Sequence, residues 1–110
     1  MHLKNFSMME NPSGWGLAPA YDLLNVSILI PEDSEELVLT LAGKKKNLNW
    51  IHFEKLGKNL ELTDKQIQGV YKRMVKNKSK ANDWINKSFL SDKMKEAYTQ
   101  LVEKRHEKLI

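Results

Sequence analysis

Hydrophobic positions in the second part of the chain recur at the three- and four-residue spacing of amphipathic helices. Asn49 is placed to cap a first helix, residues 63–66 (Thr-Asp-Lys-Gln) form a capping box before a second, and Ser91 is placed to cap the last. A polar joint at residues 76–80 separates the second helix from a shorter third. The four apolar stripes are Trp50, Ile51, Phe53, Leu56 and Leu60; Ile67, Val70, Tyr71, Met74 and Val75; Ala81, Trp84, Ile85 and Phe89; and Met94, Ala97, Tyr98, Leu101, Val102 and Leu109.

The first 46 residues follow a different pattern. Apolar and polar side chains alternate loosely over residues 3–10, as in a strand. An Asn-Pro-Ser-Gly turn follows at residues 11–14, and a second strand runs from Trp15 to Pro19. We therefore expect a β-hairpin. A short helical turn is expected at residues 21–24. The alternation of Leu37, Leu39 and Leu41 predicts one further strand. The predicted fold class is α+β, mainly α: a hairpin and strand segment over residues 1–46, then a helical bundle over residues 47–110.

Composition is that of an ordinary globular chain, with 110 residues of which 41% are hydrophobic and 29% charged. This length supports one domain or a piece of one. No run approaches the roughly 18 apolar residues of a membrane span, and no secretory pattern opens the chain, so a cytoplasmic location is expected. There is no cysteine, and His2, His52 and His106 lie far apart, which excludes disulfides and argues against zinc.

Charge is divided unevenly along the chain. Residues 1–43 have a net charge of −5, whereas residues 44–110 have a net charge of +9. The basic half can be the solvated face of ordinary helices, or it can bind DNA or an acidic protein. Five basic residues lie on and just after the second helix: Lys72, Arg73, Lys76, Lys78 and Lys80. Four aromatic residues are expected to lie mainly in the core: Trp50, Trp84, Phe89 and Tyr98.

Two short motifs flank the predicted hairpin. The first is His-x-Lys-Asn-x-Ser over residues 2–7, and the second is Pro-x-Tyr-Asp over residues 19–22. Taken singly, Asn5 is a typical turn residue and Asp22 a typical helix cap. Together they offer an amide oxygen and a carboxylate, the hard oxygen ligands that magnesium prefers. A tight hairpin would bring these two positions, seventeen apart in sequence, within a few ångströms.

In this order, the two motifs resemble the C-terminal region of HipA-type serine/threonine kinases, the toxins of bacterial toxin–antitoxin pairs. Residues 39–45 (Leu-Thr-Leu-Ala-Gly-Lys-Lys) are similar to the strand and basic turn of that family. The resemblance covers essentially the whole chain, but only the first 25 residues contain specific motifs. It implies that Asn5 and Asp22 bind magnesium and that Lys4 lies beside the phosphates or the substrate. His2 would hold the loop by hydrogen bonding.

The resemblance also implies ATP as cosubstrate, a protein substrate of the translation machinery, and a DNA-binding antitoxin or an upstream kinase lobe as partner. The family's catalytic Asp would fall one residue before Met1. Of the catalytic-loop residues, His2 and Lys4 are present, so the catalytic set is incomplete. Neither the Gly-rich loop nor the strand Lys of a nucleotide lobe occurs in this sequence. We therefore expect the chain alone to bind no cofactor and to have no catalytic activity. Such a chain would arise from an internal start in a longer protein or from a truncated gene.

The alternative from a different class is a free-standing helical interaction module that binds DNA or an acidic protein through its basic half. In either case, apolar side chains left uncovered could drive self-association. The sequence leaves open the substrate, the oligomeric state and whether the chain folds unaided.

Overall fold

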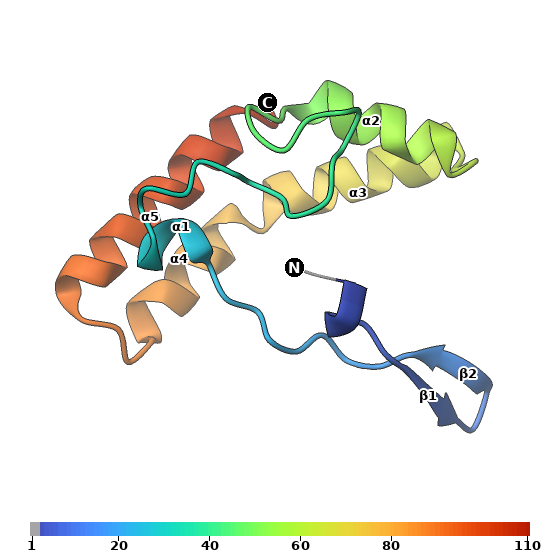
Figure 1. Ribbon diagram of the computed structural model, residues 1–110, viewed down its shortest axis with the longest axis horizontal. Helices are drawn as coiled ribbons and strands as arrows, with labels where there is room; N and C mark the ends of the chain where they lie inside the picture. Colours follow the sequence, from blue (N-terminus) through green and yellow to red (C-terminus); the bar gives the residue numbers. More distant parts are fainter. Residues whose placement is uncertain (1–2) are drawn as a thin grey trace.

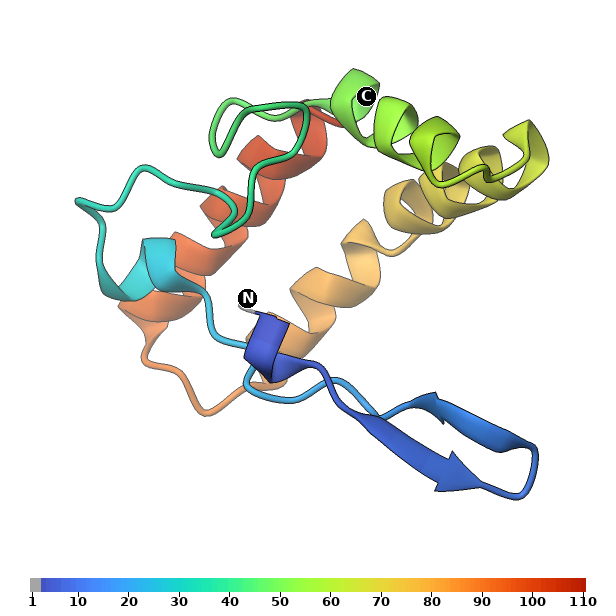
Figure 2. The ribbon, with the colours of Figure 1, turned by 45° about the vertical axis from the view of Figure 1, so that its right-hand side comes forward.

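The computed structural model describes residues 3–110, and its first part is a β-hairpin that extends away from the helices (Figures 1 and 2). Strands β1 (Met8–Asn11) and β2 (Gly14–Leu17) are antiparallel, with Met8 opposite Leu17. Gly14 has a φ of 108°, which only glycine adopts easily, and this permits the tight reversal. The predicted hairpin is confirmed, although the strand begins at residue 8 and a 3-10 turn, η1 (Leu3–Asn5), precedes it.

The four predicted helices are all present as α2 (Trp50–Asn59), α3 (Asp64–Lys76), α4 (Lys78–Lys87) and α5 (Asp92–Glu107). The capping box before α3 forms as predicted, since the Gln66 side chain accepts from the Thr63 N–H at 2.8 Å and the Thr63 hydroxyl accepts from the Gln66 N–H at 3.3 Å. Ser91 caps α5 by accepting from the Met94 N–H at 3.4 Å. The segment that joins α3 to α4 is shorter than the predicted residues 76–80, because only Asn77 separates the two helices.

The helices pack in consecutive pairs around a small core. In α2, the buried Gly57 lies against Ile67 of α3, and the ring centroids of Trp50 and Tyr71 are 4.7 Å apart. Helices α4 and α5 contact each other, and the short α1 (Val26–Leu29) lies against α5. The radius of gyration is 15.8 Å, against about 13 Å for a compact chain of this length. Among the described residues, the buried apolar side chains are Leu41, Leu48 and Ile67.

The fold class predicted from the sequence, α+β and mainly α, is confirmed. Within residues 3–110, no helix is both long and apolar enough to cross a membrane.

Two local predictions in the first half are wrong. Residues 37–42 do not form a strand, because Ala42 and Gly43 both have positive φ and turn the chain back, leaving one isolated bridge between Leu41 and Lys44. A strand needs a neighbouring strand to satisfy its backbone, and among residues 3–110 this segment lies beside none. The helical turn expected at residues 21–24 occurs instead as α1, where the Asn25 side chain accepts from the Ile28 N–H at 3.3 Å.

The expected core role of two aromatic residues is also wrong. Trp84 is 68% exposed and Phe89 is fully exposed, whereas Trp50 and Tyr98 are partly buried. In α4, Ala81 and Ile85 are partly buried, whereas Trp84, from the same predicted apolar stripe, is exposed.

Candidate functional site

Asn5 and Asp22 meet at the base of the hairpin. The strand pairing extends one step past the start of β1 and the end of β2, through a hydrogen bond of 2.9 Å from the Ala18 N–H to the Ser7 carbonyl oxygen. This brings the segment after β2 back beside η1. There the Asn5 side-chain nitrogen Nδ2 donates a hydrogen bond to Asp22 Oδ2. The hairpin thus brings the two predicted positions into direct side-chain contact.

The two partners differ in exposure and backbone conformation. Asn5 is 8% exposed and is the one buried polar residue in the part of the chain that the structure describes. Asp22 is exposed, and its φ of 52° places it in the left-handed region, which Asp and Asn tolerate better than most residues. A fixed amide therefore faces a carboxylate whose other side is open to solvent.

This pair fits a magnesium ion by its donor chemistry. Magnesium takes one or two protein oxygen ligands and completes its shell with water and nucleotide phosphates. Asp22 offers a carboxylate oxygen, and Asn5 offers its amide oxygen once the amide is turned by 180°, a choice that heavy-atom positions leave open. With the amide nitrogen toward Asp22, the Asn5 N–H places partial positive charge beside the carboxylate.

The protein supplies few ligands at this point. Within residues 3–110, no group of three or more His, Cys, Asp or Glu side chains is arranged to hold a metal ion. One carboxylate and one amide bind magnesium weakly on their own, so the phosphates of a nucleotide would have to complete the site.

The remaining predicted residues are less constrained. Lys4 lies in η1, directly before Asn5, with an exposed side chain. It takes part in none of the ion pairs found within the described residues. His2 lies outside the described residues.

The structure adds one neighbour that the sequence pattern did not indicate. Tyr98 of α5 lines a hollow of about 310 Å³ together with the segment Asp22–Asn25. The helical spacing of Tyr98 predicts a core position, and it is partly buried. A sequence pattern shows which face of α5 is apolar, but not that the chain after the hairpin returns to that face.

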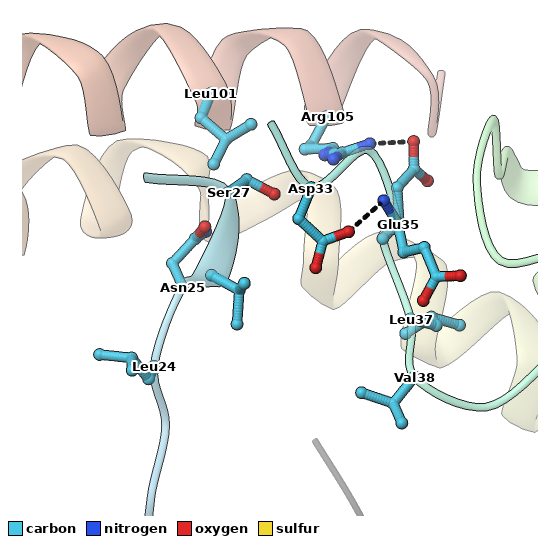
Figure 3. A pocket seen from close by; sticks show the side chains of 11 residues that line it. Leu24, Asn25, Ser27, Asp33, Glu35, Leu37, Val38, Leu101 and Arg105 are labelled. Atoms are coloured by element: carbon cyan, nitrogen blue, oxygen red, sulfur yellow. Dashed lines mark hydrogen bonds and ion pairs between the residues drawn. The ribbon is translucent and has the colours of Figure 1, made fainter. Parts of the chain in front are cut away.

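A second cavity, of about 200 Å³, lies between the segment after the hairpin and α5 (Figure 3). Its acidic side chains include Glu36, which pairs with Arg105 and lies 3.2 Å from Lys108 Nζ. Burial raises the pKa of the Glu36 carboxyl, but the Leu48 N–H, Arg105 and Lys108 together outweigh burial, and the net pKa lies below its ordinary value. This carboxylate is already neutralised by the protein, so it fastens a loop and is not free for a ligand.

Fold and site together define the class of protein: a mainly helical α+β domain with an amide–carboxylate pair at the base of an N-terminal hairpin. The family model described as "HipA-like C-terminal domain" matches residues 1–103. The chain belongs to the HipA-like C-terminal domain family. This relation links it to HipA-family toxins and to toxin–antitoxin pairs. No curated protein matches the chain.

Proposed function

We propose that this chain is the C-terminal part of a HipA-type serine/threonine kinase toxin and that Asn5 and Asp22 hold the magnesium of Mg–ATP. The observation that supports this most strongly is the contact between the buried Asn5 amide and the Asp22 carboxylate across a seventeen-residue separation. A buried amide that faces an exposed carboxylate at the base of a hairpin has no evident role in the small core of this domain.

Each residue has a distinct task in this proposal. When bound, magnesium would neutralise the phosphate oxygens and orient the nucleotide for phosphoryl transfer. Asp22 supplies the negative charge, and its open side leaves room for phosphate oxygens and water. Asn5 contributes a neutral oxygen at a position fixed by burial. The exposed Lys4 lies next to the pair and would contact the phosphates.

The wider role follows from the family. We propose that the complete kinase phosphorylates a Ser or Thr hydroxyl of a protein of the translation machinery in the cytoplasm. A DNA-binding antitoxin would be its partner. The base that accepts the hydroxyl proton and the groups that bind the adenine would come from other parts of that kinase.

The metal role is tested with an excess of Mn²⁺ and ATP over the 110-residue chain. Mn²⁺ takes oxygen ligands and broadens the NMR signals of nearby nuclei even when it binds weakly and briefly, so the test does not require a stable complex. The variant is Asp22→Asn, which removes the charge and tolerates the positive φ of this position. The matched control is Asp33→Asn, since Asp33 is also exposed and accepts a local hydrogen bond, from the Glu35 N–H at 2.9 Å, that Asn can accept.

We expect Mn²⁺ to broaden the Asn5 side-chain amide signal in the unmodified chain and in Asp33→Asn, but not in Asp22→Asn. Equal broadening in all three chains would refute the metal role. In a longer polypeptide that joins this domain to its nucleotide lobe, Asp22→Asn should lower autophosphorylation about 100-fold or more. Undiminished autophosphorylation would show that Asp22 has no part in catalysis.

A further inference from the structure

One face of α3 and α4 forms a basic stripe, defined here as six positions that follow one another at steps of three, four or seven residues from 65 to 87. All of these side chains are exposed. Arg73 lies beside the stripe, as do two exposed carboxylates, Asp64 next to Lys65 and Asp83 next to Trp84. The stripe consists of Lys65, Lys72, Lys76, Lys80, Trp84 and Lys87.

The stripe passes from α3 to α4 across the single residue Asn77, where the last hydrogen bond of α3 and the first of α4 meet. The Asn77 N–H donates to the Arg73 carbonyl oxygen at 3.1 Å, and the Ala81 N–H donates to the Asn77 carbonyl oxygen at 2.9 Å. Helix α4 follows α3 end to end, with a bend at the joint, as Figures 1 and 2 show. From Lys65 to Lys87 this path is about 33 Å long at 1.5 Å per residue.

The opposite face of the same two helices holds the fold together. Ile67 is buried against Gly57 of α2, and Lys78 Nζ lies 2.5 Å from Glu103 Oε2 of α5. In contrast, no ion pair within residues 3–110 includes a lysine of the basic stripe or Arg73. The stripe thus has no partner within the described part of the chain.

We propose that the basic stripe binds the phosphate backbone of a single-stranded nucleic acid and that a base stacks on Trp84. Lysine is suited to phosphate as a point charge, whereas carboxylates are bound best by the two-pronged guanidinium of arginine. Lysine is also depleted at protein–protein interfaces, where arginine is enriched. Five lysines beside one arginine therefore favour a polyphosphate chain over an acidic protein.

The exposed Trp84 favours a single strand over a duplex as the ligand of the stripe. Its side chain is 68% exposed and stands between Lys80 and Lys87 on the stripe. An indole ring among lysines is the arrangement that single-strand binders use, with the cations following the backbone and the ring stacking on an unpaired base. A duplex offers no free base face at such a position.

The test measures binding of the 110-residue chain to a fluorescein-labelled single-stranded oligonucleotide over a range of salt concentrations. Lys76→Gln with Lys80→Gln should reduce the slope of log K against log salt by about 1.4, since each lost phosphate contact contributes about 0.7 for single strands. The matched control is Lys93→Gln with Lys104→Gln, two exposed lysines of α5. This pair changes net charge equally and should leave the slope unchanged.

The stacking step is tested by Trp84→Ala, which should weaken binding about 5- to 150-fold. Its control is Trp15→Ala on β2, because Trp15 is 70% exposed and lies off the stripe. Equal losses in the two lysine pairs, or no binding at low salt, would overturn the proposal. Tighter binding to a duplex or to poly-glutamate than to the single strand would overturn it as well.

This inference does not depend on the metal role. Asp22→Asn should bind the oligonucleotide as the unmodified chain does, so failure of one proposal leaves the other standing.

Discussion

Glu36 is the side chain whose removal should weaken the fold most clearly. It is 13% exposed and fastens the loop before α2 to the C-terminal end of the chain. Its two carboxylate oxygens accept hydrogen bonds of 3.1 Å from the N–H groups of Asn47 and Leu48. One of these oxygens also pairs with Arg105 and Lys108.

The substitution Glu36→Gln keeps the shape of the side chain and removes its charge and one acceptor oxygen. A backbone N–H left without its partner costs about 1–2 kcal/mol, and the two ion pairs, whose cations are about one third exposed, add about 0.5 kcal/mol each. The expected loss is about 2–3 kcal/mol in the free energy of unfolding. At roughly 4 °C per kcal/mol, the thermal midpoint should fall by about 8–12 °C.

The pH dependence gives a second readout with a definite sign. Because the pKa of Glu36 is lowered on folding, its contribution is present above the pKa of an unfolded glutamate, about 4.3. As the pH falls from there through the folded pKa, that contribution disappears. The difference between the unmodified chain and Glu36→Gln should therefore be full at pH 7 and shrink below about pH 4.

Urea unfolding followed by circular dichroism measures both effects. The control is Glu35→Gln, which makes the same charge change one residue away, where the side chain is 49% exposed and pairs with Lys45 at 3.5 Å. It should change stability by less than about 0.5 kcal/mol. Equal stabilities for the two variants at pH 7, or a Glu36→Gln effect that does not shrink in acid, would refute the reasoning.

Two further predictions concern the helices, both measured by urea unfolding. Gly57→Ala should destabilise the fold by about 1–2 kcal/mol, because its new methyl group would lie 2.8 Å from Ile67 Cγ1. Gly69→Ala, which meets nothing within 4 Å, should instead stabilise by about 0.5–1 kcal/mol. Changes of the same sign would contradict the packing of α2 on α3. Thr63→Ala should lower the free energy of unfolding by about 1 kcal/mol, because the helix cap is lost, whereas Thr63→Ser should leave it almost unchanged. Equal losses for these two would exclude the hydroxyl as the cause.

The helical half could be predicted from local chemistry alone. The capping box at Thr63 and the cap at Ser91 act within one turn, so their residues are adjacent in sequence and visible there. The pairing of Asn5 with Asp22 was also predictable in position, because a short hairpin leaves its two ends close together.

Contacts between segments far apart in the chain could not be read in this way. Glu36 accepts hydrogen bonds eleven and twelve residues ahead and pairs with Lys108, seventy-two residues away. The alternation of residues 37–41 predicted a strand because period two is a property of the segment. Whether a strand forms depends on a partner, and here a turn at Ala42 and Gly43 intervenes.

The sequence by itself determined the fold class, the helix boundaries to within a few residues, the hairpin and the two motifs at its base. These depend on spacing, caps and turn residues, whose interactions are local. Only the tertiary structure decided that Asn5 is buried while Asp22 is open and that Trp84 is exposed. It also decided that, within residues 3–110, Lys78 forms an ion pair while the lysines of the basic stripe form none. The physical reason is that burial and pairing depend on which elements meet in space, and a periodic pattern fixes the faces of a helix but not its neighbours.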